Sequence, residues 1–241
     1  MTMDIRALRA AITGLAGFAA VQEQALICGA AEAESGDPAC WAAVPLIAHN
    51  TEFRHQQVLR LRAIRARQVP PEFPEADHQS ASLYAALSAQ PADAVATESW
   101  RVSGELIEEV RLAGADDLLD PARHPWLRGR PLWLQIIVRG FWHPAGHLGE
   151  YYGHHAQSGR AVTVAELAVA TAAALDAPAP ARGMASYNLA CARAGAGLLA
   201  EAAEAVAEAI ELNPDVRANA ARDPDLAPVR DQDLLSAVLS G

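Results

Sequence analysis

The sequence predicts an all-α protein, and three observations lead to this prediction. Ala, Leu, Glu and Arg dominate the composition, whereas aromatic residues make up only 5% of it. Apolar residues recur at intervals of three and four, and the alternation of β-branched residues that strands show is scarce. At 241 residues the chain can form one large domain or one domain with an appendage.

The helical period and the positions of prolines place the individual elements. Gly36-Asp37-Pro38 should end the first helix, and Pro70, Pro71 and Pro74 forbid continuation of the second. Trp100 is expected to face the core, and Thr163 is expected to cap a helix that ends at Leu175. Helices are predicted over residues 3–34, 41–67, 77–89, 93–113 and 131–159, with a long ordered loop over 114–131.

The last part of the chain has a different character. Residues 176–182 are rich in Pro and Ala and predict a stiff linker between a domain over 1–175 and a segment over 183–241. The offsets within this segment resemble one tetratricopeptide repeat, and they are carried by Leu189, Ala190, Gly197, Ala202, Ala209 and Pro214. A lone repeat is not stable by itself, so it should either dock on the first domain or pair with a second copy or another protein.

The charge of the chain argues against a nucleic-acid partner. The formal net charge of −10 repels the phosphate backbone, and no dense Lys/Arg run offsets it. Arg60, Arg62, Arg65 and Arg67 lie near the end of the second helix, where a solvated face that complements the helix dipole is the favoured interpretation.

The cysteines and the N-terminus predict a cytoplasmic protein. Cys28, Cys40 and Cys191 form an odd set without CxxC spacing, which fits a reducing compartment. Residues 11–21 are apolar after two arginines, as in a signal peptide, but the run is short and Gln22-Glu23-Gln24 follows at once. No stretch reaches the roughly 18 apolar residues of a membrane span, so no membrane partner is expected.

One segment concentrates the groups that could carry chemistry. Residues 142–155 contain four of the eight histidines. On a helix His143 and His147 are four residues apart and Glu150 follows three later, so the three side chains share one face. A metal ion needs a further ligand, and His49 in the second helix is the candidate.

Three neutral imidazoles would suit zinc, nickel or iron and would leave one coordination position open. Water bound there would become acidic enough to supply hydroxide, and a bound thiol would be held as thiolate. Glu150 could orient His147 or act as a catalytic base.

A second interpretation stays open, in which the three histidines are hydrogen-bonded core residues. Pro144 bears on the choice, because it lacks a backbone donor and is expected to bend the helix between His143 and His147. His154 and His155 are too far along the helix to share an ion with His147, and they are interpreted as a polar helix end.

The order of these elements resembles the DinB-like superfamily of helical bundles. The segments that carry the resemblance are His49-Asn50-Thr51-Glu52-Phe53-Arg54-His55-Gln56-Gln57 and His143-Pro144-Ala145-Gly146-His147-Leu148-Gly149-Glu150-Tyr151-Tyr152, which are most similar to the branch near ClbS and DfsB. The resemblance implies a four-helix bundle over residues 1–175 with a three-histidine metal site. It also implies thiol transfer to electrophilic small molecules in some members, and hydrolytic detoxification in the ClbS branch.

The sequence therefore predicts a metal-dependent enzyme that acts on a reactive small molecule, with His49, His143 and His147 as ligands and Glu150 in support. A low-molecular-weight thiol is a candidate second cofactor. The alternative is a non-catalytic protein that binds a partner or sequesters a ligand through the bundle and the repeat-like tail.

Overall fold

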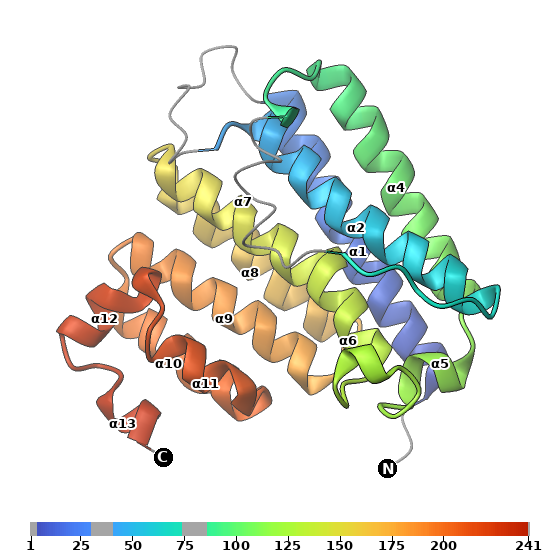
Figure 1. Cartoon of the computed structure of the whole chain (residues 1–241). Helices are drawn as coiled ribbons and strands as arrows, with labels where there is room; N and C mark the ends of the chain where they lie inside the picture. The colour runs from blue at the N-terminus through green and yellow to red at the C-terminus, as the bar shows by residue number, and fades with distance from the viewer. Residues whose placement is uncertain (1–3, 30–40, 74–85, 241) are drawn as a thin grey trace. The chain divides into compact units, whose positions relative to one another are not determined.

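The computed structural model describes residues 4–29, 41–73 and 86–240, and over these ranges every regular element is a helix (Figure 1). The all-α prediction is therefore confirmed for the part of the chain that the structure describes. Packing divides the chain into two compact units, residues 1–144 and residues 145–241.

The first unit is built from long helices that pack along one another. Helix α1 packs against α2, α4 and α6, and α2 packs against α4. The elements of this unit are α1 (Ile5–Gly29), α2 (Ala43–Arg65), α4 (Ala92–Leu112), α5 (Ala115–Leu119), a 3-10 turn (Pro125–Leu127), α6 (Leu132–Ile137) and a π-helical turn (Val138–Trp142). The helices predicted over 41–67 and 93–113 are confirmed to within a few residues.

A buried ion pair joins three helices of this unit. Nη2 of Arg54 on α2 donates to Oε2 of Glu23 on α1 at 2.5 Å, and both side chains are fully buried. Asn50 donates to the other carboxylate oxygen at 2.9 Å, and Ser99 of α4 donates to Oε2 at 3.1 Å. Nε and Nη1 of Arg54 are buried without an acceptor among the described residues, so the guanidinium depends on Glu23 for its charge balance.

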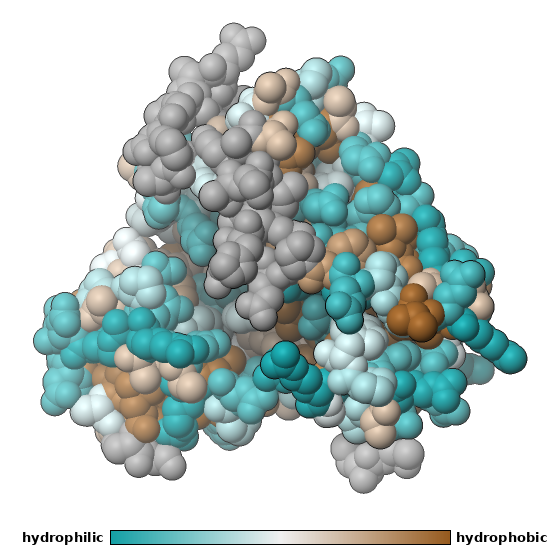
Figure 2. All heavy atoms as spheres, viewed as in Figure 1, coloured by the Kyte–Doolittle hydropathy of each residue, from teal (hydrophilic) through white to brown (hydrophobic). Residues whose placement is uncertain are grey.

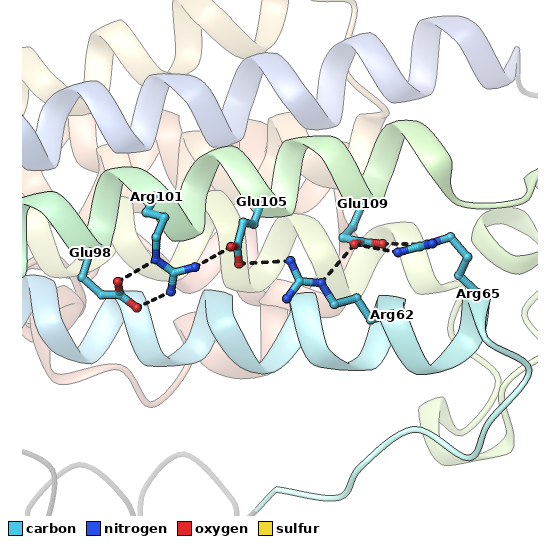
Figure 3. A network of polar contacts seen from close by, with 6 residues as sticks. All are labelled: Arg62, Arg65, Glu98, Arg101, Glu105 and Glu109. Atoms are coloured by element: carbon cyan, nitrogen blue, oxygen red, sulfur yellow. Dashed lines mark hydrogen bonds and ion pairs between the residues drawn. The ribbon is translucent and has the colours of Figure 1, made fainter.

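A second polar network connects α2 and α4 at the surface (Figure 3). Glu109 accepts from Nε of Arg62 and from Nε and Nη2 of Arg65, each at 3.1 Å. Burial alone would raise the pKa of Glu109, but hydrogen bonds from Arg65 and Arg62 outweigh it and lower the pKa. Glu105 extends the row, since it pairs with both Arg62 and Arg101. Arg62 and Arg65 therefore pair with α4 rather than forming only a solvated face.

Several predictions for individual residues are wrong. The predicted loop over 114–131 contains α5 and a 3-10 turn. Trp100 is 56% exposed, because it lies on the outer face of α4. Thr163 does not cap a helix: α8 begins at Ser158, and the Thr163 hydroxyl donates to the carbonyl of Gly159 within it. The helix predicted over 77–89 falls mostly outside the described residues.

Helix α1 bears on the predicted absence of a membrane span. By length and composition it is the one helix among the described residues that could cross a bilayer, and half of its most apolar stretch is buried inside the structure. Core helices of soluble proteins and signal sequences have the same properties, so the cytoplasmic location stays a prediction. On the face drawn in Figure 2, hydrophilic residues predominate and the hydrophobic residues form separate patches.

The second unit contains a helical hairpin. Helix α9 (Ala179–Gly195) packs against α8 (Ser158–Ala174) on one side and α10 (Leu199–Leu212) on the other. Gly197 turns the chain between α9 and α10 with a φ of +78°, a conformation that favours glycine. Ala190, Ala202 and Ala209 are completely buried where the helices approach, as their spacing predicts. Pro214 follows the end of α10 and begins a 3-10 turn.

Helix α9 comes close to the backbone of α10 at Gly183. A Cβ atom built there would lie 2.7 Å from Cβ of Asn213 and 2.9 Å from the carbonyl oxygen of Ala209. The short helices α11 (Arg217–Ala220), α12 (Ala227–Asp231) and α13 (Ser236–Ser240) complete the unit. Tyr187 of α9 donates to Asp223 of this tail at 2.6 Å, which attaches the tail to the hairpin.

The two compact units do not coincide with the domains predicted from sequence. Residues 145–241 include α8 as well as the hairpin, and α9 begins at Ala179, so the predicted linker is largely helical. A division by packing does not show which segment folds alone, and the boundaries at 175 and 183 stay predictions.

Replacing Glu23 by Gln should destabilise the protein by about 3–5 kcal/mol, because it leaves the buried Arg54 guanidinium without a counter-charge. Urea unfolding followed by circular dichroism measures the change. Glu98→Gln, which removes the acid of an exposed pair with Arg101, is the control and should leave stability almost unchanged. Similar stability of the two variants would contradict a central role for the buried pair.

Gly183→Ala should destabilise the protein by about 1–3 kcal/mol, since the added methyl group meets backbone atoms of α10. Gly195→Ala is a matched control on the same helix, because nothing lies within 4 Å of its Cβ position. Thermal unfolding of both variants measures the difference. If Gly183→Ala unfolds at or above the wild-type temperature, the close approach of α9 and α10 is not as described.

Candidate metal centre

A π-helical turn places His143. In residues 138–142 the helix widens, and the backbone N–H of His143 donates to the carbonyl of Val138, five residues back. Pro144 follows as the second residue of α7 (His143–His154), directly after this wider turn, which accommodates the hydrogen bond that proline cannot make. The π-helical turn that accommodates Pro144 therefore lies before His143, and the helix from His143 onward is a regular α-helix.

His49 and His143 meet inside the first unit. Their Nε2 atoms are 3.1 Å apart, and His49 is 1% exposed, whereas His143 is half-buried. Phe53 contacts both imidazoles, with ring centroids 4.7 Å from His49 and 5.1 Å from His143. Trp41 packs its ring edge to face with His49 at 5.1 Å. The imidazole of His49 is thus held between two aromatic rings, and that of His143 packs against one of them, which restricts their orientation.

His147 lies one turn beyond His143 on the same face of α7. Because α7 is continuous, the position of His147 relative to His143 follows from helix geometry alone. The ligating nitrogens of His49, His143 and His147 lie within 4.8 Å of one another. Pro144 therefore does not move His143 away from His147.

Glu150 orients His147. Nδ1 of His147 is 2.7 Å from Oε2 of Glu150, three residues along α7. An ionised carboxylate only accepts hydrogen bonds, so Nδ1 carries the proton in this contact and Nε2 is the nitrogen with a lone pair. Glu150 is 49% exposed on its side chain, whereas His147 is 23% exposed. The carboxylate is therefore more exposed to solvent than the imidazole that it contacts.

The spacing of the donors fits a divalent metal. Two nitrogens bound to one ion at about 2.0–2.1 Å lie roughly 2.9–3.4 Å apart, depending on the angle at the metal. The separation of 3.1 Å between His49 and His143 falls within this range, and it is also the length of a hydrogen bond between the two imidazoles. Since the three nitrogens lie within 4.8 Å of one another, His147 would need to move by at most about 1.7 Å to reach the same spacing, a shift that a side-chain rotation supplies.

The remaining histidines have other surroundings. Nδ1 of His155 contacts the carbonyl of Tyr151 at 2.8 Å, and His154 is exposed at the end of α7, as expected for a polar helix end. Nε2 of His124 lies 3.0 Å from the carbonyl oxygen of Asp117 and is buried. His78 lies outside the described residues.

The second unit brings Cys191, Asp223 and Asp225 together, with their ligand atoms within 4.8 Å of one another. Burial, followed by the charges of both aspartates, raises the pKa of the Cys191 thiol well above its usual value. Burial also raises the pKa of Asp225, with Asp223 adding to it. A protonated thiol is a weak ligand, so this cluster is less suited to a metal than the histidines.

Sequence reasoning missed two residues around the histidines. Trp41 contacts His49, and Arg139 lies over the ring of Phe53 with its Cζ atom 4.5 Å from the centroid. Arg139 carries a signal in retrospect, because it is a lone cation within the apolar run from Leu132 to Trp142. Trp41 carries none, since its contact depends on the packing around the start of α2.

Comparison of the chain with protein-family models, with curated proteins and with solved structures gives no match. The resemblance to DinB-like bundles and to one tetratricopeptide repeat therefore rests on the sequence segments quoted above.

Glu150→Ala should change the tautomer of His147, because Nδ1 then loses the carboxylate that holds its proton. Proton–nitrogen NMR correlation of the histidine rings distinguishes the two tautomers. We expect the Nδ1–H form of His147 in the wild type and a larger Nε2–H fraction in the variant, with no change at His124. A wild-type His147 that already carries its proton on Nε2 would contradict the geometry described here.

Proposed function

We propose that His49, His143 and His147 bind one divalent metal ion and that the protein is a metal-dependent transferase or hydrolase acting on a reactive small molecule. The observation that supports this most directly is the 3.1 Å separation of the His49 and His143 nitrogens, with His147 one turn away. A hydrogen bond between two core histidines would explain the contact between His49 and His143, but not the approach of a third imidazole nitrogen. Convergence of three ligating nitrogens is better explained by a shared ion.

The composition of the set favours zinc, nickel or iron, which prefer imidazole nitrogen. A metal held by three protein ligands supplies a Lewis acid and lowers the pKa of a water or thiol that occupies the remaining position. His143 and His147 are only half-buried, so a small molecule can approach them from solvent, whereas a structural metal site is normally closed by four protein ligands.

Glu150 has two roles in this proposal. Its hydrogen bond to Nδ1 fixes the ring and the tautomer of His147, so that the lone pair is on Nε2. Its exposure lets it exchange protons with solvent, so it can accept a proton from a nucleophile near His147 and release it again. The chain thus contains both the nitrogen set for the ion and a carboxylate positioned to move a proton.

The finer assignments belong to the same proposal. A DinB-like bundle with a single tetratricopeptide-like hairpin accounts for the order of the helices and for the segments that contain the histidines. A low-molecular-weight thiol as second cofactor, and detoxification as the physiological role, follow from that resemblance.

The alternative is a non-catalytic bundle whose C-terminal tail recruits a partner or forms a dimer. Helix α9 packs against α8 within one compact unit, and Tyr187 attaches the tail to α9. This packing favours a structural role for the hairpin, so the enzyme is the better supported proposal.

The metal content of the protein tests the proposal. Protein purified without a histidine tag should contain about one equivalent of zinc, nickel or iron by mass spectrometry. His147→Ala should lose most of this metal, because only two ligands are left. His154→Ala is the matched control on the same helix and should keep it, since His154 is exposed at the helix end.

Circular dichroism of each variant shows whether the fold is retained. A content below about 0.1 equivalent in the wild type after incubation with each of these metals would contradict the proposal. Equal metal contents in the wild type and His147→Ala would do the same.

A further inference from the structure

Two arginines of the first unit have no acidic partner among the described residues. Arg60 on α2 and Arg139 in the π-helical turn are both half-buried, and neither forms an ion pair with a residue that the structure describes, in contrast to Arg62 and Arg65. The acceptors of Arg60 are neutral and distant: Oε1 of Gln57 at 3.5 Å and the carbonyl of Pro71 at 3.4 Å. Half-buried charges without a counter-charge are unusual, because burial costs free energy that pairing normally offsets.

Aromatic rings hold both guanidinium groups in place. The Cζ atom of Arg60 lies 4.9 Å from the ring centroid of Phe73 and 4.8 Å from that of Trp126. Arg139 lies over Phe53, the same ring that contacts His49 and His143. Only one aromatic ring therefore separates the Arg139 guanidinium from the candidate metal ligands.

The two arginines are close enough to repel each other. Burial, and after it the charge of Arg139, lowers the pKa of Arg60 to about 10, and burial also lowers the pKa of Arg139. At neutral pH Arg60 is still protonated, so the pair is a local concentration of positive charge. This contrasts with the net charge of −10 of the whole chain, which by itself repels anions.

Buried N–H groups of the same cluster also need an acceptor. Nε of Arg139 and Nε1 of Trp126 are buried and have no hydrogen-bond acceptor among the described residues. More than nine-tenths of buried donors in proteins are satisfied, and an oxyanion offers several acceptor atoms at once. Guanidinium groups bind carboxylate and phosphate through two parallel hydrogen bonds.

We propose that Arg60 and Arg139, with the indole N–H of Trp126, bind the carboxylate or phosphate group of a small anionic molecule beside His49 and His143. That this molecule is the substrate of the histidine site rests on the proposed function. Binding of the oxyanion by these three residues does not depend on the proposed function. Arg139 would hold the molecule beside Phe53, the ring that contacts both His49 and His143.

Isothermal titration with inorganic phosphate and with acetate tests this site. The titrations use the protein as purified and after treatment with a chelator, so that anion binding and metal binding are measured separately. Arg139→Gln and Arg60→Gln should each weaken binding at least about tenfold, because each removes a charged, bidentate donor. Arg139→Lys keeps the charge without the planar donor pair and should weaken binding less.

Arg111→Gln is the matched control, because the Arg111 side chain is 64% exposed and already pairs with an acid, Glu108. It should bind as the wild type does. The proposal is overturned if chelator-treated wild-type protein shows no saturable binding of either anion, or if Arg139→Gln and Arg60→Gln bind as the wild type does. If the anion binds only in the presence of the metal, and with the same affinity in both arginine variants, the metal ion is what binds the anion. This result would also overturn the proposal.

A protein that contains metal but binds no anion in the chelated state would leave the proposed function standing and remove only this subsite. A protein that binds phosphate through Arg139 but holds no metal would leave the anion-binding site standing and remove the proposed function.

Discussion

The first unit depends on the buried pair of Glu23 and Arg54. A carboxylate and a guanidinium that are both removed from water fix the relative positions of α1, α2 and α4, because either charge alone would be strongly unfavourable there. Asn50, which donates to the same carboxylate, directly follows His49 in the chain. The interaction that holds the three helices together therefore also fixes the backbone that presents the first candidate ligand.

The second constraint is the π-helical turn before His143. A proline inside a regular helix removes one hydrogen bond and clashes with the carbonyl four residues earlier. Here the wider turn over residues 138–142 accommodates this, and the regular helix that starts at His143 keeps His147 on the same face. The same turn presents Arg139 next to Phe53, so one local irregularity positions a candidate ligand and a candidate anion-binding residue.

The sequence was informative where a periodic pattern reports on a local property. Helices over 41–67 and 93–113, the turn at Gly197 and the face shared by His143, His147 and Glu150 all follow from spacing within one element. It was uninformative where the outcome depends on packing between elements. Glu23 follows an apolar run and reads as its hydrophilic end, yet it is completely buried because Arg54 meets it from another helix. The half-burial of Arg60 and Arg139 depends on aromatic rings from distant segments, which no spacing rule predicts.

The buried pair thus positions His49 on α2, and the π-helical turn precedes the regular helix that carries His143, His147 and Glu150. The central claim is that the three imidazoles share an ion. Anomalous X-ray diffraction from crystals of untagged protein, measured on both sides of the absorption edge of the metal found in solution, tests it most directly. The account predicts one anomalous peak between His49, His143 and His147, within about 2.0–2.3 Å of each nitrogen. Strong anomalous peaks elsewhere, with none between these histidines, would contradict it.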